Sequence, residues 1–150
     1  MLKKLMKTDN ALTPLILRLT LGGVMFPHGA QKMLGWFGGY GFSATYGYFT
    51  HAGMPAALAL ALIIGEFCAS LGLIFGFLTR IAAAGELIIM TCAILMVHYQ
   101  NGFFMNWMGN QKGEGFEYHL LAIGIALAVI LKGGGALSLD RFVCGGKKKK

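Results

Sequence analysis

The sequence predicts an all-α protein, a bundle of four transmembrane helices with both termini in the cytoplasm. Hydrophobic residues make up 56% of the 150-residue chain and charged residues 13%, whereas an average soluble protein has about 25% charged residues. The apolar residues are concentrated in four blocks, at about 12–30, 55–78, 80–98 and 116–132. Because so few polar side chains cannot cover that apolar surface, residues 1–150 are predicted to form one integral membrane domain.

The positions of the charged residues predict the orientation of these spans. The net charge is +7, and most basic residues lie before the first block, between the second and third, or after the fourth. Only Lys32 and Lys112 lie in the other two connecting segments. This asymmetry follows the positive-inside rule and differs from the clustered patch of a nucleic-acid-binding protein. The lysines at 147–150 are predicted to meet anionic lipid headgroups.

The first block carries a polar and small-residue stripe. At 100° per residue, Arg18, Met25 and Lys32 fall on one side of a helix, with Gly29 and His28 close by. A cation inside an apolar span costs roughly 2.5–3.5 kcal/mol on insertion scales, so it predicts a partner or a function. Gly22 lies near this stripe and is expected to let a neighbouring helix approach closely.

The second and third blocks predict an antiparallel helical hairpin. The turn GFLTR between them is too short for another connection. Glu66 lies near the middle of the second block and Glu86 about two turns into the third. The fourth block has a clear apolar core of only 12 residues, at 120–131, whereas a full crossing needs about 20. It is predicted to be a thin span whose end is extended by Lys132.

The segment at 33–55 is predicted to be an outer loop. It is rich in glycine and aromatic residues, and His51 is its only basic or acidic side chain. Two interpretations fit this composition: an aromatic belt at the membrane interface, or a lid folded over a small-molecule site. The three cysteines, Cys68, Cys92 and Cys144, have no CxxC spacing, so neither a disulfide framework nor a metal site is expected.

The first group of candidate residues lies toward the cytoplasmic side and consists of Arg18, Glu66 and Glu86. One cation and two carboxylates in lipid are expected to pair inside the bundle. We expect a structural ion pair between Arg18 and Glu66, with Arg18–Glu86 as the close alternative. In a second interpretation, the unpaired carboxylate handles protons or substrate.

The second group lies at the outer ends of the spans, where all four histidines fall. Histidine exchanges protons near neutral pH, and a lysine can hold an anion or a polarised carbonyl, as a quinone or oxyanion pocket requires. Glu117 and His119 point about 200° apart on an ideal helix, so a shared mouth needs the helix to start after Glu117. His28, Lys32 and Glu66 are the catalytic candidates. The candidates for cofactor binding are His98, Tyr99, Glu117 and His119, and no metal site is predicted.

These residues resemble the DoxX family of small four-helix bacterial membrane proteins. The resemblance rests on R18-L-x-x-G22, followed by H28-G29-x-x-K32, and on G65-E66, followed by G72-L-x-x-G76-x-x-T79-R80-x-A82-A83; G115-x-E117 then opens the last span. It implies a location in the bacterial inner membrane and an association with respiratory or sulfur-linked oxidoreductases, including thiosulfate:quinone oxidoreductase subunits. The positions it implies are Arg18, His28, Lys32, Glu66, Arg80 and Glu117.

The leading hypothesis is therefore an inner-membrane subunit of an oxidoreductase system, with quinone-linked or sulfur- and thiol-related electron transfer. Soluble-enzyme motifs such as GxGxxG, a P-loop or GxSxG are missing, so any reaction needs a partner protein or a lipid-soluble cofactor such as quinone. Two other functions fit the same residues: a small transporter or exporter subunit, which would need to form an oligomer, and a scaffold that recruits a soluble enzyme to the membrane.

Overall fold

Residues 2–144 are described by a computed structural model, in which every regular element is a helix. The four long helices are α2 (Leu12–Leu34), α4 (Ala56–Phe75), α5 (Thr79–Ala93) and α6 (Glu117–Lys132). The short helices are α1 (Leu2–Leu5), α3 (Gly41–His51) and α7 (Leu139–Val143). The long helices coincide closely with the four predicted blocks, and the lysines at 147–150 lie outside the described residues.

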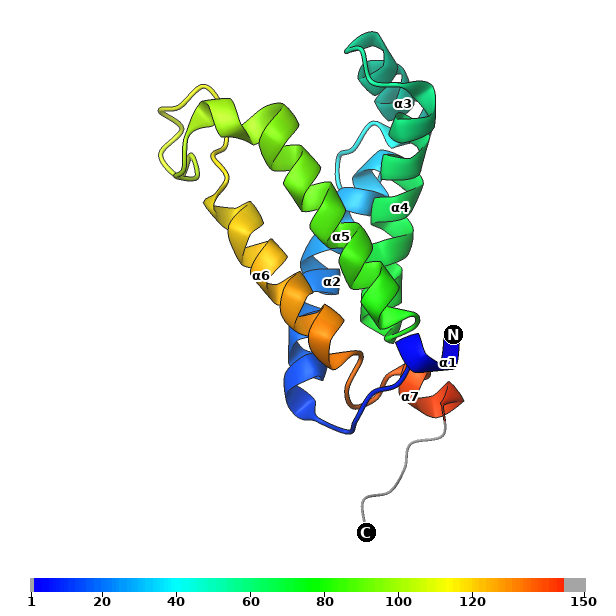
Figure 1. The fold of residues 1–150 in the computed structure, drawn as a ribbon. Coiled ribbons are helices and arrows are strands. Elements are labelled where there is room, and N and C mark those ends of the chain that lie inside the picture. Colours follow the sequence, from blue (N-terminus) through cyan, green and yellow to red (C-terminus); the bar gives the residue numbers. More distant parts are fainter. Residues whose placement is uncertain (1, 145–150) are drawn as a thin grey trace.

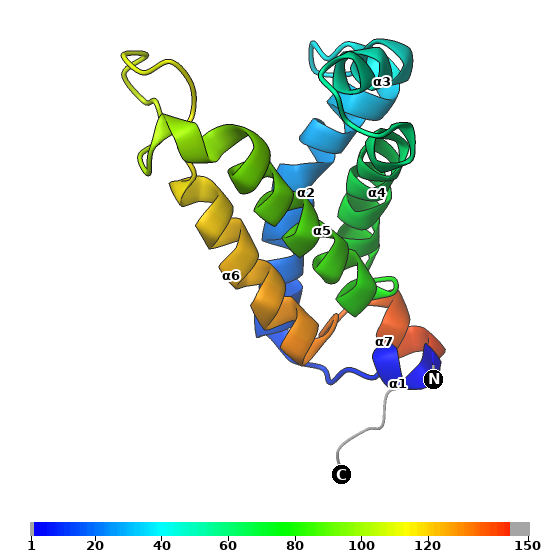
Figure 2. The same cartoon turned by 45° about the horizontal axis from the view of Figure 1, so that its top comes forward.

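The long helices form two arms that share one end of the molecule. Helix α2 packs along α4, α5 packs along α6, and the short turn at 76–78 joins α4 to α5 as the predicted hairpin. In Figures 1 and 2 the two arms diverge toward the end that carries α3 and the loop at 102–116. Helices α1 and α7 lie at the opposite, narrow end. We call these the wide end and the narrow end.

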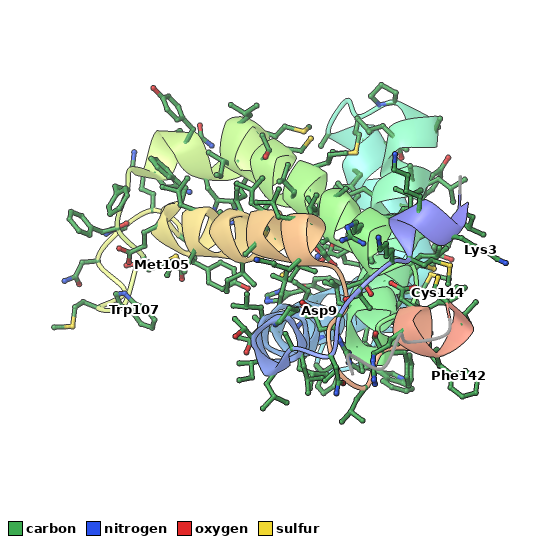
Figure 3. All side chains as sticks on the ribbon, turned by 60° about the horizontal axis from the view of Figure 1, so that its bottom comes forward. Lys3, Asp9, Met105, Trp107, Phe142 and Cys144 are labelled. Atoms are coloured by element: carbon green, nitrogen blue, oxygen red, sulfur yellow. The ribbon has the colours of Figure 1, made fainter. Side chains whose placement is uncertain are left out.

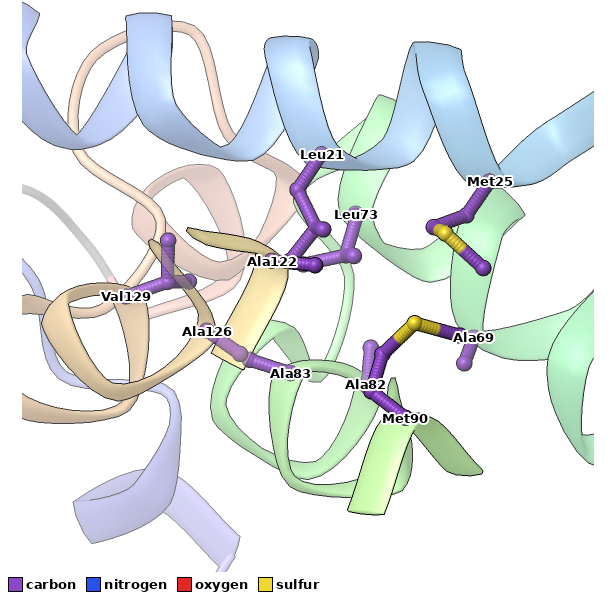
Figure 4. Packing of buried hydrophobic residues seen from close by; sticks show 10 residues of the cluster. All are labelled: Leu21, Met25, Ala69, Leu73, Ala82, Ala83, Met90, Ala122, Ala126 and Val129. Carbon is purple, nitrogen blue, oxygen red and sulfur yellow. The ribbon is translucent and has the colours of Figure 1, made fainter. Parts of the chain in front are cut away.

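Small side chains fill the space where the arms meet. Leu21 and Leu73 reach from α2 and α4 toward Ala83, Ala122 and Ala126 on α5 and α6 (Figure 4). All five side chains are buried. Alanines at the contact let the helices approach closely, and they leave little room below the wide end for a ligand.

Two helical stretches are long and apolar enough to cross a membrane by length and composition: Ala56–Phe75 and Thr79–Asn101. The second is α5 together with its continuation, a π-helical turn at Ile94–His98 and a 3-10 turn at Tyr99–Asn101. Only 33% and 22% of the two apolar windows are buried inside the protein. Their remaining apolar surface therefore needs a lipid or protein environment.

The structure overturns the predicted partner of Arg18, which contacts neither Glu66 nor Glu86. The guanidinium donates hydrogen bonds of 2.6–3.2 Å to five backbone carbonyls. Two of these belong to the last turn of α4 and three to the connection after α6; they are the carbonyls of residues 73, 74, 134, 136 and 137. Carbonyls at a helix C-terminus have no partner within the helix and attract a cation. The Arg18 side chain thus holds the C-terminal segment against the narrow end.

The narrow end is closed by two further polar side chains. Asp140 of α7 accepts hydrogen bonds from the backbone N–H groups of Leu78 and Thr79 and from the Thr79 hydroxyl, which caps the first turn of α5. Arg80 donates to the carbonyls of Leu5 and Lys7. Figure 3 views this end and shows Lys3, Cys144 and Phe142 near one another.

The predicted outer loop at 33–55 is only partly a loop, because it contains the eleven-residue helix α3. Helix α3 lies across the outer ends of α2 and α4 and contacts both. None of its residues is buried. The segment was predicted to be a loop because it is rich in glycine. Four of these glycines, Gly35, Gly38, Gly41 and Gly53, have positive φ and lie at the turns before and after α3.

Candidate functional site

The candidate site begins where α2 and α4 approach most closely. A Cβ on Gly29 would lie 2.8 Å from the Cα of Phe67, and one on Gly22 would lie 2.9 Å from the Cβ of Leu73. These glycines are seven residues apart and share one helix face, so α2 lies flat against α4. The contact brings the end of α2, with Lys32, beside the middle of α4, with Glu66.

Lys32 and Glu66 form an ion pair at this contact. The ammonium group donates a hydrogen bond to Glu66 Oε1 at 2.7 Å. The Glu66 side chain is 3% exposed and the Lys32 side chain 27%, so the carboxylate is enclosed while the ammonium still reaches open space. Among residues 2–144 this is the single salt bridge. The structure thus joins two of the three predicted catalytic candidates, which were not expected to pair with each other.

A cavity of about 610 Å³ opens beside this pair, between the two arms at the wide end. Its polar lining includes His28, Lys32 and Glu66 on the α2–α4 arm and Tyr118 and His119 on α6; Tyr48 and Gln100 also line it. Cavities of about 300–1,000 Å³ with a mainly apolar lining and a few convergent polar groups are typical small-molecule sites. The position and chemistry of this cavity match the predicted outer mouth.

The apolar lining comes from α2, α3, α4, α5 and the π-helical turn that continues α5. Four methionines contribute, and unbranched thioether side chains adapt to ligands of varied shape. The π-helical turn at Ile94–His98 adds to the wall, and such turns occur frequently at functional sites. Tyr48 and Phe49 of α3 also line the cavity, so this helix contributes to its wall. The apolar side chains that line the cavity include Met25, Met54, Leu62, Met90, Met96 and Val97.

His119 carries an unsatisfied polar atom at this cavity. Its side chain is 6% exposed, and its ring lies 4.1 Å from the ring of His98, measured between centroids. His98 Nδ1 contacts the carbonyl of Glu114 at 2.8 Å, whereas His119 Nδ1 has no hydrogen-bond partner. A buried polar atom without a partner is rare in proteins and marks a place where a ligand or water is expected.

Tyr118 is a site residue that the sequence analysis missed. Its hydroxyl donates only a weak hydrogen bond, to the Sδ of Met25 at 3.5 Å. The position of Tyr118 just before His119, on the first turn of the fourth span, was the available signal. Its ring meets that of His119 edge-on, 5.5 Å away.

Two other predicted residues, Glu117 and Tyr99, lie away from the cavity. Glu117 accepts hydrogen bonds from the backbone N–H of Met105 and the indole N–H of Trp107, so it organises the loop at 102–116. Tyr99 is 70% exposed and stacks on Phe116. Helix α6 begins at Glu117, which turns this carboxylate away from the face that carries His119.

The remaining histidine, His51, is also away from the cavity. It is exposed, and its Nδ1 contacts the carbonyl of Gly47 on the same helix. The expectation of one mouth shared by all these groups therefore holds for His28, Lys32 and His119. His98 takes part only through its contact with His119.

Glu86 is buried beside the candidate site without contributing to its surface. Its side chain is fully buried, and neither carboxyl oxygen has a hydrogen-bond partner. Glu66 of α4 and Lys32 of α2 act on it electrostatically, and Glu86 acts in turn on Tyr118. In the described part of the chain, the atoms of Glu86 and His119 are the buried side-chain nitrogen and oxygen atoms that lack a partner.

Comparison with known proteins places this arrangement in a family. The family model named DoxX matches residues 13–99, which span α2 to α5 and include Lys32, Glu66 and Glu86. The chain belongs to the DoxX family. It is 34% identical over 134 residues to a curated protein named "Putative oxidoreductase CatD" from Bacillus subtilis (strain 168), a match that covers 89% of each chain. No solved structure matched the chain.

The residues matched by the family model include part of the cavity lining. The α2–α4 side of the site, including the Lys32–Glu66 pair, lies inside the matched residues 13–99. Tyr118 and His119 lie beyond them, on α6. The DoxX family and a relative named as an oxidoreductase support a membrane role associated with oxidoreductase chemistry.

Proposed function

We propose that this DoxX protein is a multi-pass subunit of an oxidoreductase system in the bacterial inner membrane, and that its cavity binds a quinone. Helices α2, α4, α5 and α6 all cross the bilayer in this proposal. All four have large apolar side chains exposed outward. Helices α2 and α6 do not meet the composition or length expected of a membrane span. Their exposed apolar side chains include Leu12, Ile16, Leu19, Val24, Leu120, Leu121, Leu127 and Leu131.

The narrow end is proposed to face the cytoplasm. It gathers the basic residues before α2, at the α4–α5 turn and after α6, and Arg80 is bonded there to the carbonyls of Leu5 and Lys7. Lys32 and Lys112 lie toward the wide end. Following the positive-inside rule, the cavity then opens toward the outer leaflet.

The ion pair at the polar end of an apolar cavity is the observation that carries the quinone proposal. A quinone is a lipid-soluble ring with two carbonyl oxygens, which need hydrogen-bond donors. The Lys32 ammonium has three donors, of which one is held by Glu66 Oε1 and a second reaches the His28 carbonyl at 3.4 Å, and His119 Nδ1 is unpartnered. Tyr48, Met96 and Val97 line the cavity and are also exposed at its edge, which gives a lipid-dissolved molecule an apolar way in.

A binding measurement tests this proposal. The purified protein in lipid nanodiscs is titrated with a short-chain naphthoquinone. Changing Lys32 alone would leave the buried Glu66 carboxylate without its cation. The variant is therefore the pair Lys32→Gln with Glu66→Gln, which keeps the size and polarity of both side chains. Loss of a charged hydrogen bond is worth about 1.5–3 kcal/mol, so we expect Kd to rise roughly 10- to 100-fold.

Lys112→Gln is the matched control, because Lys112 is an exposed lysine of the loop at 102–116. Its Kd is expected to equal that of the native protein. Failure of the native protein to bind any quinone, or equal binding by the paired variant, would rule out the assignment.

The electrons must come from or go to another protein. No soluble-type cofactor motif is present in the sequence, so we propose a partner redox subunit, whose chemistry includes thiol or sulfur compounds as candidates. Purification in mild detergent, followed by mass spectrometry of bound proteins and lipids, identifies it. A partner without a redox centre would favour the scaffold function over this one.

Transport remains the alternative that the buried carboxylates favour. Below the cavity, however, Leu21, Leu73 and Ala122 close the space between the arms (Figure 4). A substrate would need these helices to separate before it passed the narrow end. Proton-driven uptake into proteoliposomes that disappears in Glu66→Gln would establish transport instead.

A further inference from the structure

Glu86 is the buried polar residue that quinone binding alone does not explain. It lies on α5, one turn before Met90, which lines the cavity. Three elements pack around this part of α5, and their titratable groups facing it are Lys32 on α2, Glu66 on α4 and Tyr118 on α6. The Lys32 ammonium is bonded to Glu66, so Glu86 has no cation of its own.

A carboxylate in this position would be an isolated buried charge. Both oxygens of Glu86 lack any donor, and no water-accessible surface of the side chain remains. Burying an ionised carboxylate without a partner is far more costly than burying the neutral acid. One ammonium beside two buried carboxyl groups is electrically balanced when one of the carboxyl groups carries a proton.

Tyr118 is a cavity-lining residue on which Glu86 acts electrostatically. Its side chain lines the cavity wall, whereas Glu86 does not. The Tyr118 hydroxyl is bonded only to a weak sulfur acceptor, Met25 Sδ, at 3.5 Å. A hydroxyl is both donor and acceptor, so it can take a proton on one side and release one on the other.

We propose that Glu86 is a proton reservoir for the cavity and supplies one of the two protons used when a bound quinone is reduced. This inference rests on the proposed quinone site. The O–H bond of the Glu86 carboxylic acid breaks, Tyr118 relays the proton, and an O–H bond forms on one quinone oxygen. The second proton enters through the mouth, and two electrons arrive from the partner redox subunit. The Glu86 carboxylate then regains a proton from the mouth, which restores the starting state.

Infrared difference spectroscopy tests this proposal on the full-length protein in nanodiscs loaded with a short-chain naphthoquinone. The quinone is reduced electrochemically, so the missing partner is not needed. We expect the native protein to show the carbonyl stretch of a protonated carboxylic acid, which decreases on the timescale of reduction. Glu86→Gln removes this band without changing quinone affinity. Glu86→Asp keeps a band at a shifted position, which shows that the fold is retained.

Two further variants fix the assignment. Tyr118→Phe retains the carboxylic acid band but slows its response, because the relay is gone, and a general acid or base typically contributes about 10²- to 10⁴-fold in rate. Glu114→Gln changes an exposed carboxylate whose Oε2 accepts a bond from the N–H of Asn106, and it leaves band and response unchanged.

The outcomes separate this inference from the proposed function. If the native protein binds quinone but shows no Glu86-dependent band, or a band that ignores reduction, the reservoir is refuted and the quinone site stands. If no quinone binds, both are refuted.

Discussion

The contact between α2 and α4 positions the ion pair, and Gly29→Ala tests this directly. The new methyl carbon would lie 2.8 Å from the Cα and 2.9 Å from the N of Phe67. Both are backbone atoms, so no side-chain rotation relieves the clash. Reaching the 3.4 Å of an ordinary contact requires a shift of about 3.4 − 2.8 = 0.6 Å between the helices.

The expected cost follows from this shift. Overpacking a tight contact costs about 1–3 kcal/mol, and alanine recovers about 0.5–1 kcal/mol over glycine within a helix. We therefore expect Gly29→Ala to lower the free energy of unfolding by about 1–2 kcal/mol. Because the shift also separates Lys32 from Glu66, quinone affinity is expected to fall as well.

Gly23→Ala is the matched control on the same helix. A Cβ at Gly23 meets nothing within 4 Å, so this variant is expected to be neutral or slightly stabilising. Unfolding in mixed micelles with increasing sodium dodecyl sulfate, followed by circular dichroism, measures both variants. Equal stability of the two variants would refute the close packing of α2 on α4.

The remaining predictions concern the narrow end. Arg18→Met leaves five backbone carbonyls without their donor and is expected to lower the free energy of unfolding by about 3–5 kcal/mol. Arg18→Lys is expected to restore only part of this lost free energy. A native-like melting curve for Arg18→Met would contradict the assigned bonds. Asp140→Asn weakens the cap of α5 and is expected to cost about 1–2 kcal/mol. Asp9→Asn, whose carboxylate receives only the N–H of Ala11, is the control, and an equal loss in both would show that the cap is unimportant.

Helix positions and buried faces could be predicted from this sequence because both depend on local pattern. The apolar blocks gave the four long helices. Of the predicted stripe, Arg18, Gly22, Met25 and Gly29 are buried, whereas His28 is exposed and Lys32 is partly buried. The expected role of Gly22 in a close helix contact is confirmed. These features need only the order of residues along one helix.

The partners of the charged residues could not be predicted, because they depend on the relative depth of different helices. Arg18 lies level with Leu73, which is two turns, or about 10 Å, from Glu66 along α4. The guanidinium therefore meets helix-end carbonyls rather than a carboxylate. It also meets the segment at 133–138, whose return to the narrow end has no periodic signal, only the glycines at 133–135.

The kinds of residues in the candidate site could be predicted from the sequence, but the individual residues that line it could not. The histidines and Lys32 at the outer ends indicated a polar mouth. Whether a side chain of α6 faces that mouth depends on where α6 begins and how it is rotated, which selected Tyr118 and His119 over Glu117. The pairing of Lys32 with Glu66 depends on the depth at which the glycine contact sets α2 against α4, which a single sequence does not reveal.

Photolabelling with an azido-naphthoquinone tests the central claim most directly, because it asks which residues touch the quinone. The native protein in nanodiscs is illuminated, digested and mapped by mass spectrometry. We predict labels near Met54 and at Met90–Val97, suppressed by excess unlabelled quinone and lost in the paired variant of Lys32 and Glu66. Labels confined to lipid-facing positions such as Leu121 and Leu131, unaffected by competitor, would contradict a quinone site between the arms.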